Sequence, residues 1–313
     1  MNLIEFGDCR ETMRRWAADG LKAQMCVTSP PYFGLRDYGH PGQIGLEQTP
    51  DEYIANMVEV FRCVRDVLAD DGTLWLNIGD SYASTGGHGS IGATSQRAGR
   101  SNIEVQNARK GYAGGDGIKT KDLIGIPWLL AFALRADGWF LRQDIIWSKP
   151  NPMPESVRDR CTKAHEYIFL LSKSERYFFD SEAMKEPAVR AGDVPGGKGH
   201  YIQHSAGGHN KDGLAACGQK PVAETRNRRS VWTVATRPYK GAHFATFPPA
   251  LIEPCVLAGS RPGDIVLDPC MGSGTTAAVA LQHGRQYLGC ELNPAYQPLQ
   301  DARIADAVGP LFA

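Results

Sequence analysis

Short apolar runs alternate with amphipathic stretches along most of the chain. In residues 51–69 the apolar side chains recur at the spacing of one helix face, at Ile54, Met57, Val58, Phe61, Val64 and Leu68. Similar reasoning predicts helices at 11–18, 126–136, 249–258, 275–283 and 294–307. Apolar runs predict strands at 3–6, 23–27, 73–78, 140–147, 167–171, 177–179, 265–267 and 286–290, with a turn at Asp71-Gly72 before the third. This alternation favours an α/β domain with a mostly parallel sheet and helices on both faces.

Two stretches break the alternation. Glycine, serine, threonine, asparagine and basic residues crowd 83–120, and glycines recur through about 187–230. Long irregular segments of a compact domain are commonly functional loops or disordered ones. The pattern therefore predicts regular segments at 1–82, 121–186 and 241–313, separated by loop-rich insertions at 83–120 and 187–240.

Composition bounds the class of protein. The 313 residues, 42% of them hydrophobic, suffice for one large α/β domain. Lys+Arg 34 equals Asp+Glu 34, so binding to a nucleic acid would depend on a local basic patch. No apolar run approaches the roughly 18 residues of a membrane span, and the first residues lack the pattern of a secretory signal. The eight cysteines form no Cys-x-x-Cys pair, and their spacing fits neither a zinc ribbon nor a disulfide framework. Free cysteines of this kind favour a reducing compartment such as the cytoplasm.

The segment "DIVLDPCMGSGTTAAVA", residues 264–280, predicts a strand, a glycine turn and a helix start. Gly272, Gly274 and Ala277 match G-x-G-x-x-G/A, a pattern that lets the backbone approach a ligand at a helix N-terminus. Glu291 ends the next predicted strand, where an acid can hold ribose hydroxyls. These features predict a site for an adenosine-bearing cofactor and leave NAD and other such cofactors open.

The segment "VTSPPYFG", residues 27–34, follows a predicted buried strand. It places Ser29 before two prolines and Tyr32 after them. Two successive prolines stiffen the backbone at the mouth of the strand. Taken alone, the segment is equally compatible with a rigid surface turn.

Together, these segments resemble the motifs of a known enzyme family. "DPCMGSGTT" and "GCELNP" resemble the S-adenosylmethionine site of amino-group DNA methyltransferases, and "VTSPPY" resembles their catalytic motif. The catalytic motif comes first, as in the circularly permuted beta class. Residues 72–82, 145–173 and 243–248 are similar to this family as well.

The resemblance implies a Rossmann-like methyltransferase fold with permuted motif order. It assigns 1–82 and 121–186 to the catalytic half of one domain and 241–313 to its cofactor-binding half. Residues 83–120 would be a flexible DNA-contacting loop, and 187–240 a target-recognition insertion. The implied cofactor is S-adenosylmethionine.

The resemblance also implies roles for the residues of the catalytic motif. The amine of a nucleobase is a poor nucleophile, because its lone pair is delocalised into the ring. The Ser29 hydroxyl and the Pro30 carbonyl would accept its two N–H protons, with Pro30 and Pro31 fixing the carbonyl direction. Tyr32 would stack on a base rotated out of the duplex.

Further site residues follow from the same match. Asp80, just after strand 73–78, is a candidate to accept the proton or to hold Ser29; Asn77 is its rival, and an ordinary turn residue is an equally open interpretation of Asp80. The expected cofactor-binding residues are Asp8, Phe244, Thr246, Asp268, Pro269, Gly272, Ser273, Gly274, Thr275 and Glu291.

Basic residues in the two insertions predict contacts with DNA phosphates. Arg226, Arg228 and Arg229 lie in the second insertion, and Arg97 and Arg100 in the first. The charged face of an ordinary soluble protein is the alternative for either run. No metal site is expected, since the spacing of His200, His204, His209 and Cys217 fits no standard cluster.

Serine at the first motif position resembles the cytosine-N4 enzymes of this family, so the resemblance favours cytosine N4 over adenine N6 as the target. Two other classes stay open: an NAD(P)-dependent oxidoreductase, which leaves the Ser-Pro-Pro-Tyr segment unexplained, and a non-catalytic DNA-binding module. The expected partner is double-stranded DNA, with a cognate restriction endonuclease as a further candidate. A prokaryotic or phage-encoded cytoplasmic protein, monomeric or homodimeric, is expected.

Overall fold

A computed structural model describes residues 1–84, 112–115, 117–189, 223–236 and 247–308. The chain divides into two compact units. The main unit comprises Met1–Asp180 and Ser230–Ala313, and the second unit is Ser181–Arg229.

The main unit is built on an eight-stranded sheet of order β1-β10-β9-β2-β3-β5-β4-β8. The first five strands in this order, β1, β10, β9, β2 and β3, run parallel to one another. Strand β5 is antiparallel to both of its neighbours, β3 and β4. The bounds are β1 (Asn2–Phe6), β2 (Ala23–Thr28), β3 (Leu68–Ile78), β4 (Phe140–Ser148), β5 (His165–Ser172), β8 (Val231–Thr233), β9 (Ile265–Asp268) and β10 (Gln286–Glu291). The predicted mostly parallel α/β sheet is confirmed.

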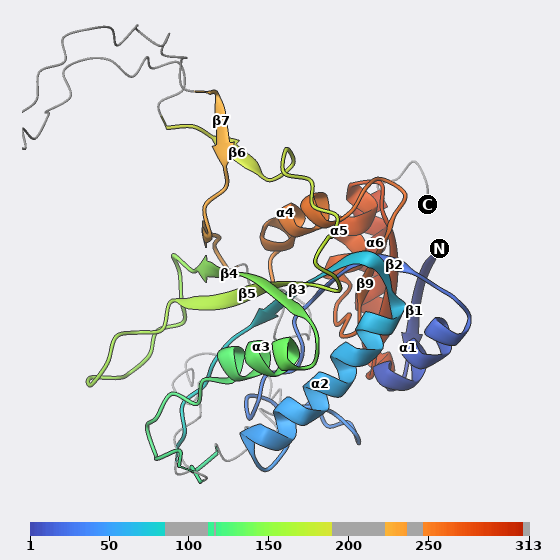
Figure 1. Cartoon of the computed structure of the whole chain (residues 1–313). Coiled ribbons are helices and arrows are strands. Elements are labelled where there is room, and N and C mark those ends of the chain that lie inside the picture. Colours follow the sequence, from blue (N-terminus) through green and yellow to red (C-terminus); the bar gives the residue numbers. More distant parts are fainter. Residues whose placement is uncertain (85–111, 116, 190–222, 237–246, 309–313) are drawn as a thin grey trace, which may run out of the picture. The chain divides into compact units, whose positions relative to one another are not determined.

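Helices cover both faces of this sheet (Figure 1). On one face α1 packs against α2 and α2 against α3; on the other, α4 packs against α5 and α5 against α6. The bounds are α1 (Cys9–Ala18), α2 (Pro50–Val67), α3 (Ile126–Ala136), α4 (Pro249–Gly259), α5 (Thr275–Gln282) and α6 (Gln297–Val308). The helix predicted at 294–307 is split, because a short 3₁₀ turn, η1 (Pro294–Tyr296), precedes α6.

Local sequence explains the longest helix. Thr49 caps the N-terminus of α2 and forms a capping box with Glu52, while Pro50 supplies a preset backbone angle in the first turn. Tyr53, Met57, Phe61 and Val64 of α2 are buried in the core, and Ile54 and Val58 pack against it while partly exposed. These signals are local, so the sequence predicts α2 to within two residues at either end.

Two predicted details of the sheet are wrong. The turn at Asp71-Gly72 lies within β3, where the pairing with β2 shifts register between Ala23 and Met25. Residues 177–179 form no strand: the Phe178 amide donates to the Asp71 carbonyl at 2.9 Å, and Phe179 stacks on Trp75. The apolar run there covers the sheet instead of extending it.

The second unit contains a two-stranded antiparallel ribbon, β6 (Lys185–Pro187) with β7 (Thr225–Asn227). Its bounds differ from the predicted insertion 187–240, since β8 belongs to the main sheet beside β4. Strands β6, β7 and β8 have three residues each, too few for an alternating pattern to be recognised. The recognition role of this unit stays a prediction.

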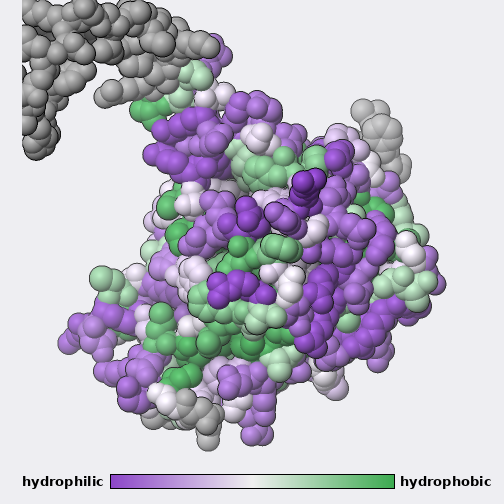
Figure 2. Space-filling view, in the orientation of Figure 1, coloured by the Kyte–Doolittle hydropathy of each residue, from purple (hydrophilic) through white to green (hydrophobic). Residues whose placement is uncertain are grey.

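The face of the main unit in Figure 2 is largely hydrophilic, with hydrophobic side chains gathered where α3 lies. Leu129 and Phe132 of α3 are among the exposed large hydrophobic residues. Arg135 covers part of this patch, since its guanidinium lies 4.9 Å from the Phe132 ring centroid. Within the described residues, no helix is both long and apolar enough to cross a membrane.

Candidate functional site

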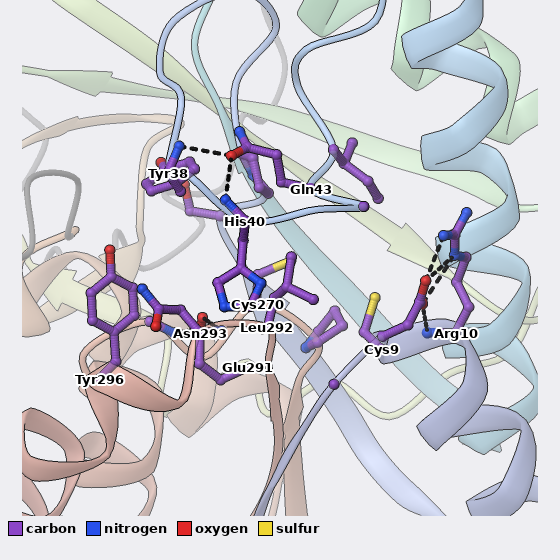
Figure 3. A pocket seen from close by; sticks show the side chains of 18 residues that line it. Cys9, Arg10, Tyr38, His40, Gln43, Cys270, Glu291, Leu292, Asn293 and Tyr296 are labelled. Atoms are coloured by element: carbon purple, nitrogen blue, oxygen red, sulfur yellow. Dashed lines mark hydrogen bonds and ion pairs between the residues drawn. The ribbon is translucent and has the colours of Figure 1, made fainter. Parts of the chain in front are cut away.

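A pocket lies at the carboxyl ends of the parallel strands (Figure 3). Ligands of doubly wound sheets bind at this edge, because the loops leaving the strands meet there. The segments after β1, β2, β9 and β10 supply its walls, and the lining includes Asp8, Ser29, Pro31, Pro269, Cys270, Gly272 and Glu291. The pocket thus brings together the two motifs, which lie at opposite ends of the chain.

The two glycines of the turn after β9 lie in different surroundings. Gly272 lines the pocket and has φ +53°, in the left-handed region that favours glycine. Gly274, with φ +82°, packs against α6: a Cβ there would lie 3.2 Å from the Gln300 Cα. The sequence predicts the turn, and Gly274 is favoured there both by its left-handed backbone and by the close approach of α6. Ser273 and Thr275 accept hydrogen bonds from Arg303 of α6.

Asp268 organises this turn from beneath. Its carboxylate is 1% exposed and accepts hydrogen bonds from the Thr28 hydroxyl at 2.7 Å, the Thr276 hydroxyl at 2.6 Å and the Cys270 amide at 3.0 Å. Burial raises the pKa of Asp268 to about 6. The side chain is absent from the pocket lining, so its contribution is to tie β2, the turn and α5 together.

Glu291, by contrast, lines the pocket. One carboxylate oxygen accepts the Gly272 amide at 2.8 Å, and the other accepts the Asn293 amide at 2.9 Å. Burial raises the pKa of Glu291 above its ordinary value. Each oxygen has further acceptor capacity, so this fixed carboxylate is suited to bind hydroxyl groups in the pocket.

Asp8 and Cys9 form the wall of the pocket at the end of β1. Asp8 caps α1 through the Arg10 amide at 2.8 Å, and its hydrogen bonds from the Arg10 side chain lower the pKa of Asp8. Burial raises the pKa of Cys9 to about 12. The Cys9 thiol is therefore protonated at neutral pH and unsuited to nucleophilic chemistry.

The catalytic motif after β2 is held by side chains from other elements. Ser29 and Pro31 line the pocket, and the Tyr53 hydroxyl of α2 donates to the Pro31 carbonyl at 2.9 Å. The Ser29 hydroxyl donates to the Tyr32 oxygen at 3.3 Å. The Tyr32 hydroxyl donates to Glu166 of β5 at 2.8 Å, so the motif is joined to the antiparallel part of the sheet.

Asp80 and Asn77 occupy different environments. The Asp80 carboxylate accepts the Gly125 amide at 3.0 Å and the Ile126 amide at 3.1 Å, at the N-terminus of α3. Asn77 lies 3.3 Å from the Tyr32 hydroxyl through its side-chain oxygen. The contact with the motif thus involves Asn77, and the role predicted for Asp80 in holding Ser29 stays a prediction.

Sequence reasoning missed one wall of the pocket. The loop after the motif contributes Tyr38, His40 and Gln43, and Tyr296 of η1 lies across from them (Figure 3). The Gln43 side chain accepts the Tyr38 amide at 2.7 Å, and burial raises the pKa of Tyr38 to about 12. The signal was a run of glycines: those at 34, 39, 42 and 45 all have positive φ.

The structure describes only some of the residues that are predicted to contact DNA. In the second unit, Glu186 pairs with Arg226 at 2.9 Å and with Arg229 at 3.2 Å; Arg228 follows β7. Phe244, Thr246, Arg97 and Arg100 lie outside the described residues, as do His200, His204, His209 and Cys217. Among the residues that the structure describes, no cluster of His, Cys, Asp or Glu could hold a metal ion.

The pocket fits a nucleoside-bearing cofactor. A buried carboxylate, Glu291, is fixed at the mouth of a parallel strand, and Gly272, in the left-handed region, lines the pocket beside it. Tyr38 and Tyr296 supply aromatic surface in the same pocket. Fold and site together define a Rossmann-like domain with a site for an adenosine-bearing cofactor.

Comparison with known proteins agrees with this class. A family model described as DNA methylase, of the N6/N4 methyltransferases, matches residues 23–301. The chain belongs to this family. It is therefore an S-adenosylmethionine-dependent DNA methyltransferase of the amino-group type, and the predicted cofactor and motif order are confirmed.

Individual relatives cover almost the whole chain. The type II methyltransferase M.SmaI of Serratia marcescens is 47% identical over 96% of this chain and 90% of its own. M.Cfr9I of Citrobacter freundii is 46% identical over 95% and 86%, respectively.

Two solved structures share the fold. The PvuII DNA methyltransferase, described as cytosine-N4-specific, has a TM-score of 0.62 at 17% identity and covers 100% of this chain and 88% of its own. The M1.HpyAVI–SAM complex has a TM-score of 0.53 at 17% identity, over 97% of this chain and 100% of its own.

Proposed function

We propose that the protein transfers a methyl group to N4 of cytosine at a specific site in double-stranded DNA. The observation that carries the proposal is the position of Ser29, which lines the cofactor pocket at the end of β2. Serine at this motif position favours cytosine N4, and adenine N6 is the alternative target. The names of M.SmaI and M.Cfr9I, both type II methyltransferases, support a role beside a cognate restriction endonuclease.

The cofactor is held from the β9 and β10 side of the pocket. Glu291 accepts the ribose hydroxyls, Gly272 lets the backbone approach, and Asp8 closes the wall after β1. The cofactor supplies an electrophilic sulfonium methyl group. Pro269 lines the same wall, while Asp268 keeps the turn in shape without entering the pocket.

The target amine is held from the β2 side. The Ser29 hydroxyl and the Pro30 carbonyl accept hydrogen bonds from its two N–H groups. These hydrogen bonds favour a pyramidal nitrogen whose lone pair points at the methyl group. Pro30 and Pro31 fix the backbone, and the Tyr53 hydroxyl holds the Pro31 carbonyl in place. The Tyr32 ring stacks on the flipped base.

DNA is bound through phosphates by the second unit. Arg226 and Arg229 share Glu186, so their guanidinium groups are oriented by one carboxylate before DNA arrives. Arg228 adds to this basic surface. Arg97 and Arg100 are further predicted DNA contacts in the first insertion. Such contacts give an affinity that falls with salt.

Methylation of mixed-sequence DNA followed by nucleoside mass spectrometry tests the proposal. We expect N4-methylcytosine. N6-methyladenine alone would change the target base and keep the mechanism, whereas C5-methylcytosine would overturn both, because that reaction needs a thiolate and no cysteine occupies the motif. Cofactor binding with no methylated nucleoside would leave a non-catalytic DNA-binding module.

A further inference from the structure

The catalytic motif is connected to a carboxylate that its sequence does not contain. The Ser29 hydroxyl donates to the Tyr32 oxygen at 3.3 Å, and the Tyr32 hydroxyl donates to Glu166 Oε2 at 2.8 Å. Three side chains from the end of β2 and from β5 therefore form a directed chain that ends on a carboxylate.

Other contacts hold the carboxylate end of this chain in place. Lys149, which follows β4, pairs with the second oxygen of Glu166. The Asn77 amide donates to Glu166 at 3.3 Å and to the Tyr167 carbonyl at 3.0 Å. The Lys149 and Glu166 side chains are only 17% and 16% exposed, so the pair is shielded from bulk water.

Close packing fixes the Tyr32 ring as well. A Cβ on Gly79 would lie 2.8 Å from Tyr32 Cε2 and 3.3 Å from the Glu166 side chain. Burial and the nearby Glu166 carboxylate raise the pKa of Tyr32 well above its ordinary value, so the hydroxyl keeps its proton at neutral pH. Tyr32 can therefore pass a proton on only if it receives one.

We propose that Glu166 is a positioning residue and the terminal proton acceptor for the methyl transfer, acting on Ser29 through the Tyr32 hydroxyl. A hydroxyl that donates to a neighbour becomes a better acceptor, because hydrogen bonds in a chain polarise one another. Glu166 thus strengthens the hydrogen bond that Ser29 accepts from the target amine. The inference rests on the proposed function in one respect, that Ser29 faces this amine.

The proton balance of the step is complete. The amine nitrogen forms one bond to carbon as the sulfur–carbon bond of the donor breaks, and it loses one N–H proton. That proton passes to Ser29 Oγ, the Ser29 proton to the Tyr32 oxygen, and the Tyr32 proton to Glu166. Glu166 becomes a neutral acid and returns the proton to water after product release, so the positive charge of the sulfonium leaves as that proton.

Three variants, Tyr32→Phe, Glu166→Gln and their combination, test the relay in single-turnover methylation at saturating DNA and cofactor. The first keeps the stacking ring without the hydroxyl, and the second keeps the shape of the side chain without the proton acceptor. We expect each single change to lower the rate by about 100-fold, with cofactor and DNA affinities within about threefold of the wild type. The double variant should be no slower than the slower single variant, because either change breaks the same chain.

Tyr53→Phe measures the structural cost of losing a hydroxyl that contacts the motif, since Tyr53 bonds Pro31 and takes no part in the chain. The decrease in rate should be smaller than that of Tyr32→Phe. Three results would each overturn the relay. The first is a methylation rate of Tyr32→Phe and Glu166→Gln near that of the wild type. The others are rate effects that multiply in the double variant and a parallel decrease in cofactor affinity. A wild-type protein that methylates no DNA would instead contradict the proposed function.

Discussion

The two units of the chain use charge in opposite ways. In the main unit the carboxylates of Asp268 and Glu291 are buried and held by backbone amides and hydroxyls. In the second unit Glu186, on the three-residue strand β6, pairs with Arg226 and Arg229, and the Arg229 side chain is 69% exposed. A rigid sheet edge is suited to placing reacting atoms, whereas an exposed basic ribbon is suited to phosphates.

This difference predicts a separation of effects between the two units. Changes in the main unit should alter turnover, cofactor affinity or folding stability. Changes in the second unit should alter DNA affinity and its dependence on salt.

The largest effect is expected for Ser29→Ala. The hydrogen bond that its hydroxyl accepts from the target amine is strongest as the nitrogen becomes pyramidal. Interactions that strengthen in the transition state appear in kcat. We expect kcat to fall by about 100-fold or more, while the Kd for DNA stays within a few-fold. Steady-state kinetics and a DNA-binding titration check this; an equal decrease in kcat and DNA affinity would assign Ser29 to binding alone.

Asp268→Asn should change how stability depends on pH. The folded-state pKa of about 6 lies above the ordinary 3.8, so the folded protein binds this proton more tightly than the unfolded chain. The resulting stabilisation is present in full below pH 3.8 and is lost as the pH rises through about 6. From about pH 7 to about pH 4 the wild type should gain up to about 3 kcal/mol relative to the variant.

Denaturant unfolding of both proteins across this pH range measures the difference. Comparing the two proteins cancels the contributions of all other carboxylates. Stability curves that run parallel over the whole range would show that Asp268 does not titrate in this way.

Glu291→Ala should weaken S-adenosylmethionine binding by about 1–3 kcal/mol, since the ribose hydroxyls and the Gly272 amide lose their acceptor. Calorimetric titration with the cofactor measures the change. Glu175→Ala is the matched control, because this carboxylate is exposed in the turn after β5 and does not line the pocket. Unchanged cofactor affinity in Glu291→Ala would remove Glu291 from the site.

The smallest effect, a change in the free energy of DNA binding, is expected for substitutions in the second unit. Replacing Arg226, Arg228 and Arg229 by alanine should weaken DNA binding and flatten its salt dependence, by about 0.9 in logarithmic slope for each phosphate that is no longer bound. Cofactor affinity should be unaffected. DNA-binding titrations at several salt concentrations measure the slope.

A control with the same charge change is available in the main unit. Arg14, Arg15 and Arg62 are exposed and each pairs with a carboxylate. Their triple alanine variant should leave the salt slope as it is in the wild type. If both triple variants flatten the slope equally, the effect comes from net charge and not from the second unit.

Much of the fold could be predicted because its signals are local. Capping residues, apolar stripes and glycine turns act within a few residues, so α2, α3 and the turn after β9 lie where the sequence predicts them. The two motifs also predicted Ser29 and Glu291 as site residues, and both line one pocket. The three-residue strands β6, β7 and β8 carry too little pattern and were missed.

The sequence by itself determined which residue types are available, the family and the cofactor. Only the tertiary structure decided which of them meet. Asp268 is held by Thr28, and Tyr32 is joined to Glu166 of β5, across separations that no local pattern spans. The reason is physical: hydrogen-bond partners are chosen by sheet order, and β1 pairs with β10 and β2 with β9 only once the chain has closed on itself.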